Sequence, residues 1–108
     1  MRRGSIVTVA VQGDFGKPRP ALVIQSDVFN DIHATVTVAL ISSDLVQAPI
    51  FRLNIVPDAE NGLNRESQIQ IDKIMSVRKE RIGSTLGQLN DMMLVRVNRA
   101  LALWLGLA

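Results

Sequence analysis

The sequence has 108 residues, which is the size of one ordinary domain and too short for two. Hydrophobic residues make up 47% of it and charged residues 20%, so the chain can bury a core and is not a disordered tail. The absence of cysteine excludes disulfides and thiolate zinc sites, and a formal charge of +2 permits a polyanionic partner without requiring one.

The first two thirds of the chain predict short strands separated by turns. Alternating or clustered β-branched and apolar residues indicate strands over 5–11, 21–25, 34–41, 50–56 and 68–71. The run at 21–25 is apolar throughout, which is typical of a central strand buried on both faces. Asn61-Gly62 marks a turn before the last strand. These segments predict a small barrel or half-open sheet.

The last segment has the pattern of a helix. Asn90 can cap its start, Asp91 suits the positive end of the helix dipole, and Gly106 can end it. Residues 100–105 are apolar on every side, and a domain this small has little interior in which to hide them. We therefore expect a subunit interface to cover them. The alternative is burial within a single subunit.

Residues 13–20 form a basic loop with two glycines and two prolines. One reading is a loop in which Gly16 lets a phosphate approach, while Lys17 and Arg19 bind it. The prolines on both sides of Arg19 restrict its backbone at the entrance of the next strand. The other reading is a hairpin tip with ordinary solvated charges. The glycine spacing excludes a Walker phosphate loop.

Other polar residues are weaker candidates for chemistry. Ser42 and Ser43 follow a strand and can donate hydrogen bonds to a phosphate, although serine is also common in turns. Asp72 is either a carboxylate base or an ion-pair partner of Lys73 or another neighbour. His33 is the only histidine, which excludes RNA cleavage by two histidines of one chain. No cluster has the spacing of metal ligands, so no metal or other cofactor is expected.

Several segments together resemble the MazF/PemK family of toxin–antitoxin endoribonucleases, which shares a superfamily with CcdB. Arg19-Pro20 and the apolar run through Asp27 resemble the most specific family motif, an R-P-hydrophobic-V-I-Q-[NS]-D signature. The match runs nearly from end to end, and its other parts are residues 3–7, 35–43, 62–67, 72–77 and 86–101.

The resemblance implies a mainly β, SH3-like barrel with a C-terminal helix, formed by residues 1–108 as one domain. It also implies a homodimer that cuts single-stranded RNA without a metal. The family's usual catalytic positions correspond to Arg19 and Ser42, and some members use an aspartate at Asp72. We also expect Gly16, Lys17, Ser43 and Lys73 to contact RNA.

The partners implied by the resemblance are a cognate antitoxin and single-stranded RNA, with DNA reached only through the antitoxin. No apolar run approaches the ~18 residues of a membrane span, so we expect a cytoplasmic protein without membrane contact.

The chain also departs from the family pattern. The loop before Arg19 is shorter than the common form, Ser42 replaces a threonine, and Met75 stands where many members have arginine. Two alternatives remain: a CcdB-like gyrase poison without nuclease activity, and an inactive module that only binds an antitoxin. The gyrase-poison branch ends in W-G-I, whereas here Trp104 is followed by Leu105-Gly106-Leu107.

Overall fold

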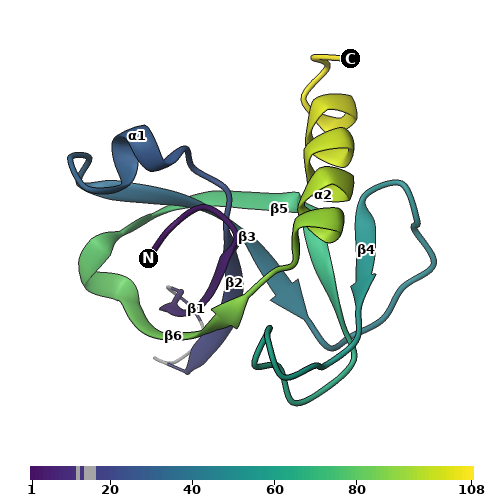
Figure 1. Ribbon diagram of the computed structural model, residues 1–108, viewed down its shortest axis with the longest axis horizontal. Coiled ribbons are helices and arrows are strands. Elements are labelled where there is room, and N and C mark those ends of the chain that lie inside the picture. Colours follow the sequence, from purple (N-terminus) through teal and green to yellow (C-terminus); the bar gives the residue numbers. More distant parts are fainter. Residues whose placement is uncertain (12, 14–16) are drawn as a thin grey trace.

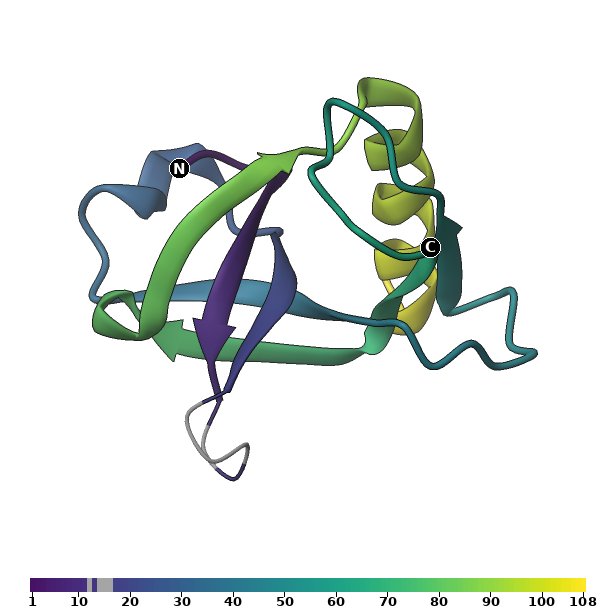
Figure 2. The ribbon, with the colours of Figure 1, turned by 90° about the horizontal axis from the view of Figure 1, so that it is seen from below.

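The computed structural model describes residues 1–11, 13 and 17–108, and within them six strands form one antiparallel sheet. The strands are β1 (Ser5–Ala10), β2 (Pro18–Val23), β3 (Thr35–Ser42), β4 (Arg52–Ile55), β5 (Ser67–Arg78) and β6 (Ile82–Gln88). Their order across the sheet is β4-β5-β3-β2-β1-β6. The sheet curls strongly, and the long strand β5 runs across most of the molecule (Figures 1 and 2). A mainly β fold with a C-terminal helix is therefore confirmed.

Closure of this sheet into a barrel is not confirmed. The two edge strands, β4 and β6, are not paired with each other in the described part of the chain. Instead, the Gln88 N–H at the end of β6 donates to the Glu60 carbonyl in the loop after β4, at 2.9 Å. The curl thus brings β6 against this loop and not against the edge of β4.

The apolar residues form two clusters on opposite faces of the sheet, because successive strand residues point to opposite sides. In β2, Leu22 belongs to one cluster, and Ala21 and Val23 belong to the other. Helix α2 (Asp91–Trp104) covers the Leu22 face and buries Val97 against it. The predicted cap is confirmed, since the Asn90 side chain accepts a hydrogen bond from the Met93 N–H at 2.9 Å.

The last turn of α2 is only partly covered by its own chain. Leu103, Trp104 and Leu105 are 56%, 49% and 56% exposed, so the alternative of burial within one subunit is wrong for these three side chains. Trp104 packs with one side against Phe51, with ring centroids 5.3 Å apart. No helix in the described residues is long and apolar enough to cross a membrane.

Several elements were not predicted from the sequence. These are β6, the short helices α1 (Asp27–Asn30) and η1 (Lys79–Arg81), and the extension of β5 from Asp72 to Arg78. Strand β6 was missed because its sequence, Ile82–Gln88, contains two glycines, which are depleted in strands. Gly87 is needed for close packing, since a Cβ there would lie 2.3 Å from the Glu60 carbonyl oxygen.

Candidate active site

A groove opens where β2 and β3 part from each other. The two strands pair at Ala21–Leu40, Leu22–Ala39 and Val23–Val38. Continuing that register would set Pro20 opposite Ile41 and Arg19 opposite Ser42, but the pairing stops at Ala21. Proline has no N–H to donate to a neighbouring strand, which favours separation at this point. A break in the β3–β5 register between Ala39 and Ile41 bends β3 at the same level.

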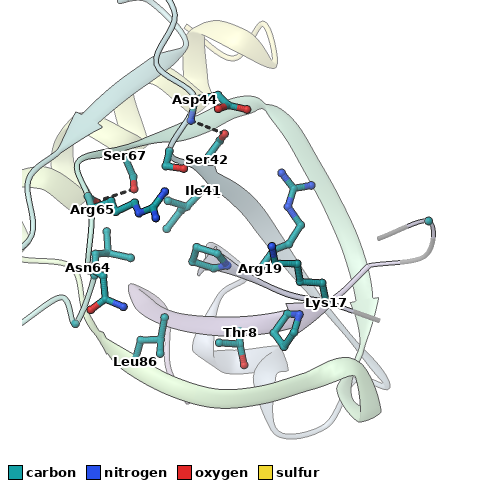
Figure 3. A pocket seen from close by; sticks show the side chains of 16 residues that line it. Thr8, Lys17, Arg19, Ile41, Ser42, Asp44, Asn64, Arg65, Ser67 and Leu86 are labelled. Carbon is teal, nitrogen blue, oxygen red and sulfur yellow. Dashed lines mark hydrogen bonds between the residues drawn. The ribbon is translucent and has the colours of Figure 1, made fainter. Parts of the chain in front are cut away.

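The groove has a volume of about 860 Å³. It contains Arg19 and Ser42, the two residues that correspond to the family's usual catalytic positions. Arg19 lines one wall, and Ser42 lies at the end of β3 (Figure 3). Ser43, the residue after β3, also lines the groove. Lys17 also lines it, while Gly16 lies outside the described residues. Of the seven residues that the sequence predicted for catalysis or RNA contact, the groove therefore contains four: Arg19, Ser42, Ser43 and Lys17.

Arg19 is positioned by a strand and not by a flexible loop. It lies within β2, where it pairs with Val9 of β1, and its side chain is half-buried. Lys17 precedes the first residue of β2 and is exposed. The two cations therefore differ in how firmly their backbones are held, as the flanking prolines predicted.

Ser42 is oriented by a short turn at the end of β3. Its Oγ accepts a hydrogen bond from the Asp44 N–H at 3.0 Å, which leaves the hydroxyl hydrogen able to donate to a ligand. Gln68, which is buried, anchors the loop that follows: its Oε1 accepts from the Val46 N–H at 3.0 Å and its Nε2 donates to the Val46 carbonyl at 2.9 Å. Ser43 is exposed beside this turn.

Asp72 and Lys73 are not among the residues that line the groove. Both lie farther along β5, and Asp72 is held by Arg52 of β4 through two hydrogen bonds. Arg52 Nε donates to Oδ1 at 2.7 Å and Nη2 donates to Oδ2 at 2.9 Å. This pairing lowers the pKa of the Asp72 carboxyl, so that it is a weaker base than an ordinary aspartate. The ion-pair reading of Asp72 is confirmed, with Arg52 as partner in place of Lys73.

The groove contains a third cation, Arg65, that was not expected from the sequence. It comes from the loop between β4 and β5, and its side chain extends into the hollow from the wall opposite Arg19 (Figure 3). The Asn61-Gly62 turn was the only local signal of an ordered loop here. Nothing in the local pattern indicated that this loop would reach the entrance of β2, because that contact depends on the curl of the sheet.

Within the described residues, no group of three or more His, Cys, Asp or Glu side chains is placed to hold a metal ion. The groove is lined instead by cationic and hydroxyl side chains. Its described charged residues are Lys17, Arg19 and Arg65 against Asp44, which gives the hollow a positive balance. Cations and hydroxyls of this kind suit a phosphate-bearing ligand.

Comparison with known proteins identifies the family. A family profile described as “PemK-like, MazF-like toxin of type II toxin-antitoxin system” matches residues 2–105. The chain belongs to this toxin family. A curated MazF/PemK relative, the probable endoribonuclease MazF of Mycolicibacterium smegmatis, is 41% identical over all of this chain and 99% of its own length. Endoribonuclease EndoA of Bacillus subtilis is 30% identical over 99% of this chain and 96% of its own.

Solved structures of the toxin family share the fold. A mycobacterial endoribonuclease, solved in complex with its cognate antitoxin, aligns with a TM-score of 0.85 at 21% identity, covering 100% of this chain and 97% of that one. The Mycobacterium tuberculosis toxin MazF-mt6 aligns with a TM-score of 0.81 at 22% identity, covering 94% and 96%. Because the curated relatives are named endoribonucleases, the CcdB-like alternative is not favoured.

Proposed function

We propose that this chain is the toxin of a toxin–antitoxin pair and cuts single-stranded RNA without a metal ion. Membership of the PemK/MazF-like family and the names of its curated relatives support an endoribonuclease. The observation that carries the proposal is the groove where β2 and β3 part, with Arg19 on one wall and Ser42 at the end of the facing strand. A fixed guanidinium and a hydroxyl are suited to a phosphodiester.

In this reaction the ribose 2′-oxygen attacks the adjacent phosphorus. The bond from phosphorus to the 5′-oxygen breaks, which leaves a 2′,3′-cyclic phosphate and a 5′-hydroxyl. The 2′-hydroxyl loses a proton and the leaving 5′-oxygen gains one, so the overall composition is unchanged. Arg19 would stabilise the negative charge that develops on the phosphate oxygens, a contribution often worth about 3 kcal/mol. This role requires no proton transfer from the guanidinium.

Ser42 would donate its hydroxyl hydrogen to a phosphate oxygen or contact the 2′-hydroxyl. The Asp44 N–H, which already binds the Ser42 Oγ, directs that hydrogen elsewhere. Lys17, Ser43 and Gly16 would contact RNA along the groove. Asp72 is left out of this mechanism, because its carboxylate lies outside the groove and both of its oxygens bind Arg52. Lys73, its exposed neighbour, is also left out, because it does not line the groove.

The partners in this proposal are a second copy of the chain and an antitoxin, and the protein would act in the cytoplasm. An RNase there must be kept inactive, and an acidic, partly disordered segment that folds onto the toxin could block the positive groove. DNA would be reached only through the antitoxin. The solved mycobacterial endoribonuclease with its cognate antitoxin supports this kind of partner.

A cleavage assay on a long RNA tests the proposal. The purified chain is incubated in EDTA with the RNA and with DNA of the same sequence. We expect cuts in the RNA alone, ending in a cyclic phosphate, and we expect an equimolar amount of the neighbouring gene's product to stop them. Cutting of DNA, or loss of RNA cutting in EDTA, would contradict the mechanism. Intact RNA under all conditions would favour a module that only binds an antitoxin.

A further inference from the structure

The loop that carries Arg65 is held rigidly by its own hydrogen bonds. The Asp58 carboxylate accepts from the N–H groups of Glu60 and Asn61, at 2.9 and 2.7 Å. The buried Asn61 side chain in turn donates to the Val56 carbonyl at 2.9 Å and accepts from the Leu63 N–H at 3.0 Å. Such side-chain bonds replace the strand pairing that the loop lacks.

Contacts at both ends fix this loop against the sheet. Gly62 has a φ of +70°, and a Cβ there would lie 2.0 Å from the Leu86 carbonyl oxygen of β6, so only glycine fits so close to the strand. On the other side, the Ser67 hydroxyl donates to the Arg65 carbonyl at 2.9 Å, and Ser67 itself pairs with Ile55. The backbone of Arg65 is therefore fixed from both directions.

The guanidinium of Arg65, in contrast, has no hydrogen bond or ion pair to any other described residue. It is exposed and extends from the left wall of the groove in Figure 3, while Arg19 stands on the right and Ser42 lies between them in that view. A cation on a rigid backbone with an unused five-donor head is suited to bind an anionic group of a ligand.

We propose that Arg65 forms a second phosphate-binding position, which holds a phosphate next to the one at Arg19 along the RNA strand. This inference rests on the proposed function. An RNA strand carries one phosphate per nucleotide, so a strand lying across Ser42 from one wall to the other presents a phosphate to each arginine. Arg65 binds the strand equally before and during the reaction. It therefore contributes to affinity and not to the rate of the bound complex.

The first test measures binding with an RNA that cannot be cut. The probe is a short RNA that the parent protein cuts, resynthesised with 2′-O-methyl groups throughout. We expect Arg65→Ala to weaken its binding about 10-fold and to reduce the salt dependence by roughly one phosphate contact. The rate at saturating cleavable RNA should stay within about twofold of the parent protein. Arg65→Lys, which keeps the charge, should recover part of the affinity.

The matched control is Arg81→Ala, which removes the same charge from an exposed position outside the groove. Its binding should equal that of the parent protein at moderate salt. Because Arg65 and Arg81 are both exposed, thermal unfolding should change little in either variant. Equal weakening by both variants would overturn the proposal, because it would show a diffuse charge effect.

A second test locates the phosphate. Single neutral methylphosphonates are placed along the uncleavable RNA, one per probe. In the parent protein, one substitution beside the cleavage position should weaken binding, and that loss should disappear in Arg65→Ala. The proposal would be overturned if no methylphosphonate position showed this coupling to Arg65. It would also be overturned if Arg65→Ala lowered the rate at saturating RNA without changing the affinity.

The two proposals can fail separately. If the parent protein cuts RNA and Arg65→Ala binds the uncleavable RNA as tightly as the parent does, only the second phosphate position is refuted. If the parent protein cuts no RNA, the proposed function fails, and the comparison is then made with an arbitrary 2′-O-methyl RNA of the same length. If Arg65→Ala binds this RNA more weakly than the parent protein and Arg81→Ala does not, the second phosphate position is still supported.

Discussion

At the scale of single residues, the cations of the groove carry the same charge but differ in how firmly their backbones are held. Arg19 lies within β2 and pairs with Val9, whereas Lys17 precedes the strand and is exposed. A donor on a fixed backbone can be aimed at charge that develops only in the transition state. A mobile ammonium mainly attracts RNA, in the ground state and the transition state alike. We therefore expect the two side chains to contribute to different kinetic constants.

Replacing Arg19 should affect the rate and not the affinity. Arg19→Ala is expected to lower the rate at saturating RNA by ~100-fold or more, with little change in binding. Arg19→Lys should also lose most of the rate, because the planar pair of donors is gone. Lys17→Ala should weaken binding modestly and reduce its salt dependence by roughly one ion. Single-turnover cleavage and binding titrations separate these effects. If Lys17→Ala proves more damaging at saturating RNA, the assignment of Arg19 is wrong.

At the scale of elements, the edge strand β4 is attached to the sheet by four residue pairs and by one ion pair. The residue pairs run from Arg52–Gln70 to Ile55–Ser67. Arg52, at the end of this ladder, also forms an ion pair with Asp72, which lies two residues beyond Gln70 on β5. Both side chains are largely buried, with 13% and 15% of their surfaces exposed. The same pairing raises the pKa of Arg52 and lowers that of Asp72. Asp72 therefore has a structural role that can be measured independently of cleavage.

The stability of the protein should depend on pH through this ion pair. Because the pKa of Asp72 is lower in the folded chain, its contribution is present above the unfolded pKa and is lost as the pH falls through the folded value. Asp72→Asn should reduce the free energy of unfolding by about 1–2 kcal/mol at pH 7. The difference should shrink below about pH 4. Denaturant titrations at several pH values measure it, and a constant difference down to pH 2 would contradict this account.

At the scale of the whole molecule, the end of α2 presents an apolar surface that one chain does not cover. Leu103, Trp104 and Leu105 are each about half exposed, although the preceding turn, with Ala100 and Leu101, is buried. A contiguous patch of this kind at the end of a helix is typical of an interface. A homodimer would cover it, as the apolar character of residues 100–105 predicted.

Light scattering at micromolar concentration should therefore give about twice the chain mass of 11.9 kDa. Leu105→Glu places a charge in the exposed patch and should shift the protein towards the monomer. Val28→Glu is the matched control, because Val28 is an exposed apolar residue of α1, and it should leave the mass unchanged. A monomeric parent protein, or equal effects of both variants, would rule out an interface at this helix end.

The sequence by itself was sufficient for the features that depend on neighbouring residues. The alternation in 50–56 predicted a strand, in which Leu53 and Ile55 are buried and Asn54 is exposed, and Asn90 predicted the start of α2. Both follow from the local periods of strands and helices. The proline-flanked Arg19 and the serines at the end of β3 could also be named in advance, and the structure places them at one groove.

Only the tertiary structure decided the features that depend on distant segments. Strand β6 contains two glycines, so it is recognisable only from its packing against β1 and the loop at Glu60. Asp72 pairs with Arg52, which is 20 residues away in sequence, because β4 lies beside β5. Arg65 reaches the wall opposite Arg19 because the sheet curls. The spacing of apolar residues within a segment predicts which face of that segment is buried. The position of a groove depends instead on where strands that are distant in sequence stop pairing.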